Sequence, residues 1–447
     1  MRMLKCPAPC AEKVVWFLGC WLCALAFSAC AAEGPVPSRG TPEPEASEIR
    51  TAGQPRSISL QGDDDSDLQF LVPLLQGKRI VQLGENTHGI HEYNLIKSRI
   101  VRFLHERLGF NVLAFESSPY QCYLADLRAS NLSARSMLSS SVFGVWHTEA
   151  LVPLFETLQD SHRSDRVFHL AGFDVQPIGP NKAGRPKFLA QQVRDASYAE
   201  EVLALDAQFL DVYSRSGSAR RSFFRSEEGQ EMAYSYDRLA EHLSSLSEAA
   251  EPEAQRDRSI ARKTARSMAW YIRQQSAPTT ADYVERRDEG MAENLIQLVE
   301  ELYPGEKVVV WGHNFHLRYD NLAIQPVQSM FPDEAARTMG SWIHDRYGSE
   351  VYTVGLYAYQ GQAADNRGQV FEISPAAEGS LEERLFDPAV DAAFLDISQT
   401  VPDGIEAWVQ EPVRARYDGR VELEMVPADQ YDAILVVGHA TPRTPLE

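Results

Sequence analysis

The chain has 447 residues, with 63 acidic against 43 basic side chains, a formal net charge of −20 and 44% hydrophobic residues. This composition is typical of a folded protein with one large domain or two ordinary ones, and it excludes an intrinsically disordered chain. The acidity argues against nucleic acid as a partner, because binding a polyphosphate requires a basic surface. An anionic membrane surface is disfavoured for the same reason.

The first thirty residues, 1–30, have the pattern of a bacterial signal peptide. Basic residues precede an uncharged run at 14–29, which is too short for a comfortable membrane span but has the length of a signal-peptide apolar region. The run ends in Phe-Ser-Ala-Cys at 27–30, similar to a lipobox, so Cys30 is predicted to become the lipidated first residue. Ordinary cleavage after Ala31 is the alternative. Either route predicts export to the periplasm or the outer cell surface, with a lipid anchor as the expected membrane contact.

Residues 31–57 contain five prolines among Glu, Ser, Gly and Thr, a composition that predicts a disordered, extended tether. The remaining residues, 58–447, are predicted to form one α/β domain. Five of the six cysteines lie in the first thirty residues, which leaves Cys122 alone in the body of the chain. A disulfide framework inside the domain is therefore excluded. The sequence carries no prediction of an oligomeric state.

Short β-branched runs alternate with segments of helical period from residue 79 onward. Most of the runs are nearly continuously apolar, which predicts a central, mostly parallel sheet buried by helices on both faces. A helical stripe from Ile90 to Leu104, ending at Gly109, predicts a crossover helix between the first two strands. The predicted strands are Arg79–Leu83, Asn111–Phe115, Val167–Phe173, Lys307–Gly312, Val351–Tyr357, Ala393–Ile397 and Ala433–Val437.

The segment 186–300 has a different character. It is rich in Glu, Arg, Ala, Ser and Gln and contains no strand-like run, so it is predicted to be a large helical insertion that caps the ligand cleft. Loops are expected within it at 216–228 and 276–280.

Polar residues follow four of the predicted strands at the point where each strand ends. The carboxyl ends of parallel strands meet at one edge of a sheet, where open α/β folds bind ligands. We therefore expect one common site, although no fragment of it is a phosphate-binding or dinucleotide-binding motif. The residues are Glu85 and His88 after the first strand, Glu116 after the second, Asp174 after the third, and His313 and His316 after the fourth.

These residue types indicate hydrolysis by an activated water. His88 is suited to act as general base with Glu85 or Glu116 as its carboxylate, and His313 with His316 to polarise a carbonyl. A nucleophilic serine is not indicated, because no Gly-x-Ser-x-Gly elbow is present. The competing interpretation is a surface lipoprotein that binds a metal, or a metal-bearing ligand, through the same histidines without turnover. The hydrolase interpretation requires no cofactor, and a divalent metal such as zinc is the alternative.

Three further residues are predicted to contact substrate, and two of them also have a structural interpretation. Lys97 lies on the first crossover helix, where it is either a substrate contact or part of a solvated face. Trp146 is either a substrate contact or a core tryptophan. Asp174 closes the third strand and is predicted to contact substrate.

In order along the chain, these motifs resemble the erythromycin esterase family. The resemblance begins with Val-Gln-Leu-Gly-Glu-Asn-Thr-His-Gly at 81–89 and continues through Gly109 to Glu116, Trp146, and Gly-Phe-Asp at 172–174. It goes on with Arg-Asp at 287–288, Met-Ala-Glu-Asn at 291–294, Val-Val-Trp-Gly-His-Asn-Phe-His at 309–316, Met-Gly at 339–340 and Gly355, and so covers most of residues 65–440.

The resemblance implies hydrolysis of an ester or lactone, as in opening a macrolide ring in antibiotic resistance, by a histidine-activated water. It implies that His88 is the general base, Glu85 and Glu116 are the active-site carboxylates, and His313 and His316 are the second histidine pair. Family members that open macrolides have an arginine where this chain has Lys97, and lysine lacks the planar fork of donors. The resemblance therefore supports hydrolysis of a small ester or lactone more strongly than it supports macrolide turnover.

Overall fold

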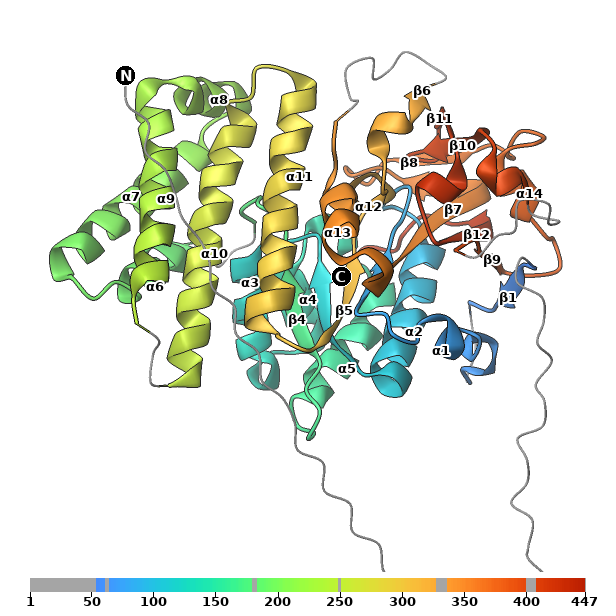
Figure 1. Ribbon diagram of the computed structural model, residues 1–447, viewed down its shortest axis with the longest axis horizontal. Coiled ribbons are helices and arrows are strands. Elements are labelled where there is room, and N and C mark those ends of the chain that lie inside the picture. The colour runs from blue at the N-terminus through green and yellow to red at the C-terminus, as the bar shows by residue number, and fades with distance from the viewer. Residues whose placement is uncertain are drawn as a thin grey trace, which may run out of the picture. The chain divides into compact units, whose positions relative to one another are not determined.

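A nine-stranded sheet forms the centre of the computed structural model, which describes residues 54–60, 64–178, 183–247, 251–326, 336–398 and 407–446 (Figure 1). Six neighbouring strands of the sheet run parallel in the order β12-β7-β2-β5-β3-β4, and β9, β1 and β8 add antiparallel pairs at the margins. The predicted mostly parallel α/β architecture is confirmed. The strands are β1 (Arg56–Ile58), β2 (Ile80–Leu83), β3 (Phe110–Phe115), β4 (His169–Gly172), β5 (Lys307–Trp311), β7 (Val351–Ala364), β8 (Val370–Ile373), β9 (Ala392–Asp396) and β12 (Ala433–Ala440).

The two faces of the sheet bury separate hydrophobic clusters. Val309 and Trp311 of β5 pack on one face, and Val308 and Val310 on the other, because successive side chains of a strand point in opposite directions. Helices α11 (Thr280–Gln297) and α13 (Met339–Tyr347) cover the second face. The first face is covered by α2 (His91–Leu108), α3 (Pro119–Leu127), α4 (Ala134–Ser141) and α5 (Val152–Ser161).

The predicted crossover helix is α2. It ends where expected, because Gly109 adopts the left-handed conformation at φ 72° and its N–H bonds back to the carbonyl of Leu104. Short helices connect strands: α1 (Leu71–Leu74) precedes β2, α12 (Asn314–Leu317) follows β5, and α14 (Leu381–Leu385) follows β8.

In the described part of the segment predicted as a helical insertion there are six α-helices, and α6 to α10 share a hydrophobic core of their own. Figure 1 shows α9, α10 and α11 side by side at one flank of the sheet. The loop expected at 276–280 separates α10 from α11, but the loop expected at 216–228 is wrong. Ser216 and Ser226 cap helices there, and Phe224 is buried between them. The other helices are α6 (Arg185–Gln191), α7 (Ala196–Ser214), α8 (Gly217–Arg225), α9 (Glu227–Ser245) and α10 (Pro252–Gln275).

A second, antiparallel sheet shares a smaller hydrophobic core with residues of β7, β9 and β12. Its strands are β6 (Gln325–Pro326), β10 (Val413–Tyr417) and β11 (Val421–Met425), which were not predicted. All the described residues belong to one unit of the chain, and β1 begins two residues before the predicted domain boundary at 58. The predicted signal peptide, Cys30 and the tether up to residue 53 lie outside the described residues. Within the described ranges, no helix is both long enough and apolar enough to cross a membrane.

Candidate active site

A cavity of about 510 Å³ opens at the carboxyl edge of the parallel strands. His88 follows β2, Glu116 follows β3, and His313 and His316 follow β5, so the predicted convergence of strand ends is found in the structure. The volume is in the range of small-molecule sites. Polar groups on its wall are His88, Glu116, Gln176, Arg287, His313, His316, Asn366 and Asp418, and aromatic rings are Phe143, Trp146, Phe315 and Tyr417.

Two glycines allow the loop after β2 to approach its neighbours closely. A Cβ on Gly84 would lie 2.0 Å from Oδ1 of Asn314, and a Cβ on Gly89 would lie 1.6 Å from the carbonyl oxygen of Ala364. Asn86, between them, bonds through its amide to the Arg416 carbonyl. The loop is therefore held from both sides, which fixes the position of the histidine within it.

His88 is held by a buried carboxylate. Its Nδ1 lies 2.7 Å from Oε1 of Glu85, and the indole N–H of Trp146 donates to the same oxygen over 2.8 Å. Glu85 is 1% exposed, whereas the side chain of His88 is 15% exposed on the cavity wall. With Nδ1–H donated to Glu85, the basic nitrogen of the ring is Nε2. This is the arrangement of a general base whose tautomer is fixed by a carboxylate.

Lys97 completes the environment of Glu85. Its ammonium donates to Oε2 of Glu85 over 2.8 Å and lies 4.1 Å from the ring centre of Trp311. Burial would raise the pKa of Glu85, but the charge of Lys97 and the hydrogen bond from His88 lower it to about 2. Burial lowers the pKa of Lys97 itself to about 8. Glu85 is thus ionised at neutral pH.

A second carboxylate lies on the cavity wall, held by Arg287 of α11. Nη2 of Arg287 lies 2.8 Å from Oε1 of Glu116 and 2.7 Å from Oδ2 of Asp174. The other oxygen of Glu116 accepts the backbone N–H of His313 over 2.9 Å. Burial opposes ionisation of Glu116, but the charges of His316 and Arg287 lower its pKa to about 2. The two carboxylates raise the pKa of Arg287 against its burial, so the guanidinium remains charged.

His316 lies between Arg287 and a buried aspartate. Its Nδ1 lies 2.7 Å from Oδ1 of Asp288, which also accepts the backbone N–H of Met339, and its Nε2 lies 3.1 Å from Nη1 of Arg287. Burial lowers the pKa of His316, but Asp288 and Glu116 outweigh it and the pKa is raised. Arg287 is therefore the fixed positive charge on this wall, and His316 faces it through Nε2.

His313 has both ring nitrogens engaged by the backbone. Nε2 lies 2.9 Å from the carbonyl oxygen of Asn86, and Nδ1 accepts the N–H of Phe315 over 3.1 Å. The ring packs 5.1 Å from that of His88. Burial and the nearby His88 hold the pKa of His313 well below its ordinary value. It is a neutral spacer between the other two histidines.

The structure thus gathers His88, Glu116, His313 and His316 on the cavity wall, with Glu85 directly behind His88. Trp146 lines the cavity and bonds to Glu85. Lys97 and Asp174 are fully buried behind Glu85 and Arg287 and do not line the cavity. Cys122 is buried too, and burial raises the pKa of its thiol, which is unsuited to a nucleophile.

Arg287 and Asp288 had no assigned role in the sequence-based site. The available signal was their place in the family-like Arg-Asp motif, since charges on a helix ordinarily mark a solvated face. Arg287 is also the one residue of the segment 186–300 among the described residues that line the cavity. Helices α6 to α10 of that segment pack on their own core, and the apolar side of α11 packs on the second face of the sheet.

Comparison with known proteins agrees with the fold. The family model for erythromycin esterase matches residues 105–440. YbfO of Bacillus subtilis, which its name describes as a candidate hydrolase, is 32% identical over 85% of this chain and 87% of its own length. Erythromycin esterase type II of Escherichia coli is 20% identical over 83% of this chain and 92% of its own. A solved structure of a mutant of the erythromycin esterase EreC in its open conformation has the same fold, with a TM-score of 0.65 and 20% identity over 89% of this chain and 100% of that one.

Proposed function

Because the chain belongs to the erythromycin esterase family, we propose that it hydrolyses a carboxylic ester or lactone with a water that His88 activates, without a covalent intermediate. Family membership and the named relatives support a hydrolase of a small molecule. The observation that carries the finer proposal is the pair formed by His88 and Glu85, whose histidine faces the cavity while its carboxylate is buried.

In the proposed reaction, Nε2 of His88 takes a proton from a water as its oxygen attacks the ester carbonyl carbon. The carboxylate of Glu85 accepts Nδ1–H throughout and stabilises the imidazolium. When the tetrahedral intermediate collapses, the alcohol oxygen leaves and takes the proton back from His88. The products are an alcohol and a carboxylic acid, and the acid becomes a carboxylate by releasing its proton to solvent. For a lactone both groups remain in one opened molecule.

Arg287 and His316 are the groups we assign to the developing oxyanion. Both lie on the cavity wall, and their positions are fixed by Asp174, Glu116 and Asp288. Preorganised cationic donors in a partly buried site stabilise negative charge that develops in the transition state. His313 was predicted to share this role, but its ring nitrogens bond to the backbone, so we assign it to positioning His88.

The alternative of a metal-binding lipoprotein has less support from this wall. The guanidinium of Arg287 lies 3.1 Å from Nε2 of His316, where a divalent ion would have to approach. A fixed cation at that place repels a metal ion. The same cation favours an anionic intermediate and a carboxylate product.

The proposal is tested with His88→Ala in the full-length protein, assayed on a panel of lactones and aryl esters that includes macrolides. We expect turnover by the wild type on at least one class and a loss on the order of 10²-fold to 10⁴-fold in the variant. His439→Ala is the matched control, because His439 is exposed and away from the cavity. Equal rates for His88→Ala and the wild type on the same substrate would overturn the proposal.

We also propose that the protein is exported and anchored to a bacterial membrane through Cys30. The supporting observations are the uncharged run at 14–29 and the Phe-Ser-Ala-Cys sequence that ends it. Labelling cells with a radioactive fatty acid should mark the wild type but not Cys30→Ser. An unlabelled wild-type protein found free in the periplasm would contradict the anchor and favour ordinary cleavage.

A further inference from the structure

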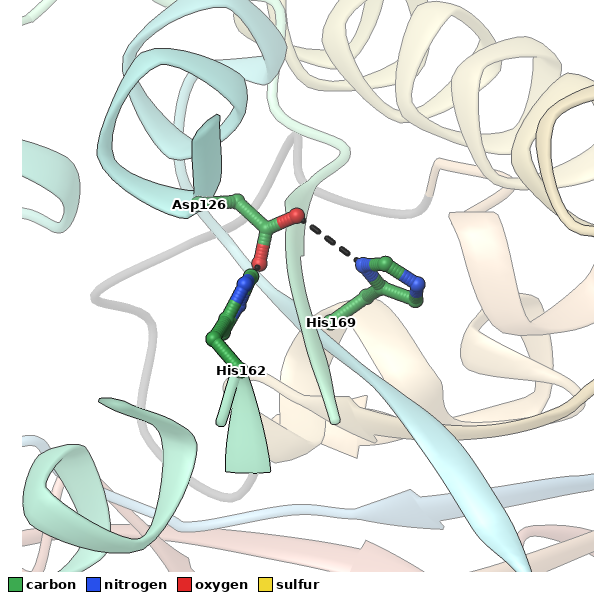
Figure 2. Close-up of side chains that lie close together, drawn as sticks. All are labelled: Asp126, His162 and His169. Carbon is green, nitrogen blue, oxygen red and sulfur yellow. Dashed lines mark hydrogen bonds and ion pairs between the residues drawn. The ribbon is translucent and has the colours of Figure 1, made fainter. Parts of the chain in front are cut away.

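Asp126, His162 and His169 meet at the edge of the sheet opposite the cavity, and each comes from a different element (Figure 2). Asp126 lies in the last turn of α3, His162 follows the last residue of α5, and His169 is the first residue of β4. The predicted catalytic role uses none of them. Asp174, which holds Arg287, lies beyond the other end of β4, roughly 16 Å away at the rise of an extended strand.

Both imidazoles point at one carboxylate, as Figure 2 shows. Nε2 of His162 lies 3.1 Å from Oδ1 of Asp126, and Nδ1 of His169 lies 3.0 Å from Oδ2. The backbone N–H of Leu170 fixes the carboxylate through Oδ1 over 2.8 Å. Burial opposes ionisation of Asp126, but the hydrogen bonds from the two histidines outweigh it and lower its pKa. An anionic oxygen and two imidazole nitrogens therefore converge, all within 4.8 Å of one another.

We propose that Asp126, His162 and His169 bind a divalent transition-metal ion of the zinc type, with water as the fourth ligand. Zinc favours histidine nitrogen and carboxylate oxygen in tetrahedral geometry with bonds of about 2.0 Å, for which neighbouring ligand atoms lie about 3.3 Å apart. The two N···O separations of 3.0 and 3.1 Å need only a small expansion to reach that spacing. Each ring would keep its one proton on the nitrogen that faces away from the metal.

The burial of the three side chains suits such a site. Asp126 is 5% exposed, while His162 and His169 are 17% and 19% exposed, so an ion can enter past the histidines and a water can remain bound. The ion-pair partners of Asp126 are the two histidines. The ion would tie α3, the end of α5 and the start of β4 together, and its place far from His88 gives it a structural role rather than a catalytic one.

The test compares full-length wild type with His162→Gln/His169→Gln after chelator treatment and dialysis, by titration with zinc chloride and metal analysis. We expect the wild type to bind one more zinc per chain than the double variant, and we expect zinc to raise the melting temperature of the wild type by more than that of the double variant. His439→Gln, which changes an exposed histidine elsewhere, should bind as the wild type does. Zinc bound by the cavity histidines would raise the number of zinc ions per chain equally in all three proteins. The difference in stoichiometry between wild type and double variant would then stay the same.

Equal zinc stoichiometry in wild type and double variant would overturn the proposal. A second measurement needs no variant and so does not depend on the folding of one. Zinc should protect His162 and His169 of the wild type from diethyl pyrocarbonate, as read by peptide mass spectrometry, while His439 stays reactive. Unchanged modification of the two histidines in the presence of zinc would also overturn it.

Discussion

Lys97 donates a hydrogen bond over 2.8 Å to Glu85, and both side chains are almost completely shielded from solvent. The other oxygen of Glu85 is the one that holds His88. A lysine on the first crossover helix thus acts on the candidate general base through the carboxylate and not through substrate. This placement makes the lysine a positioning residue in the proposed site.

Replacing Lys97 by Met should destabilise the fold strongly, because it leaves the buried Glu85 without its counter-charge. Breaking a buried ion pair by removing one partner costs about 3–5 kcal/mol. Urea unfolding at pH 7 measures the change in the free energy of unfolding. Lys187→Met, which alters an exposed lysine, should change it by less than about 0.5 kcal/mol. If the two variants are equally stable, Glu85 does not depend on Lys97 for its charge.

Replacing Glu85 by Gln should lower kcat with little change in KM. Glu85 accepts from His88, Lys97 and Trp146, and an amide has only one accepting oxygen. The imidazolium of His88 then loses its carboxylate, which predicts a loss of about 10²-fold or more in kcat. Steady-state kinetics on the best substrate of the panel measures it. Glu306→Gln, at the opposite edge near β5, serves as the control, and a Glu85→Gln enzyme with control-like kcat contradicts the assigned role.

Replacing Arg287 by Lys should reduce kcat/KM, on the order of 10²-fold, although the charge is kept. The guanidinium contacts Glu116, Asp174 and His316 together, and a single ammonium cannot reproduce that fork. Arg286→Lys is the matched control, because the neighbouring Arg286 bonds instead to the Arg273 carbonyl. Equal kcat/KM in the two variants would mean that Arg287 has only a structural role.

The parallel core was predictable because its strands are continuous apolar runs buried on both faces. Strands β10 and β11 escaped prediction because charged residues alternate with apolar ones, as with Arg414 between Val413 and Ala415 in β10, and with Glu422 and Glu424 around Leu423 in β11. That pattern belongs to a sheet with one solvated face, which the search for apolar runs does not detect. The seven predicted strands all occur in the structure.

The site was predictable where topology alone assembles it. His88, Glu116, His313 and His316 follow parallel strands and therefore had to meet at one edge. Arg287 comes from a helix, and no periodicity in the sequence shows that its charged side chain faces the sheet edge. Lys97 also comes from a helix, and the charged residues around it predicted a solvated face, because the sequence does not show which side of the helix faces the sheet. The direction of a helix relative to the sheet is set by packing, as with Met291 against the second face, and not by local sequence.

Acid should lower the free energy of unfolding mainly through the two buried carboxylates, Glu85 and Glu116, because exposed carboxylates are screened by water. The pKa of Glu85 and of Glu116 is lowered from 4.5 to about 2, so their stabilising contribution is complete above pH 4.5. It is lost as the pH falls from 4.5 through about 2, because the unfolded state then binds more protons than the folded state. The lowering of the pKa of each glutamate corresponds to a contribution of about 3 kcal/mol to the free energy of unfolding.

The matching measurement is urea unfolding of the wild type and of Glu116→Gln at pH 7, 5 and 3. The variant should be less stable at pH 7 and should lose less stability on acidification, since one of the two titrating groups is gone. Asp64→Asn is the control: Asp64 also has a lowered pKa, but its side chain is exposed, and water screens its interactions. Parallel pH profiles for the wild type and Glu116→Gln would show that the carboxylate of Glu116 is not held ionised by Arg287 and His316, and the proposed arrangement of that wall would be wrong.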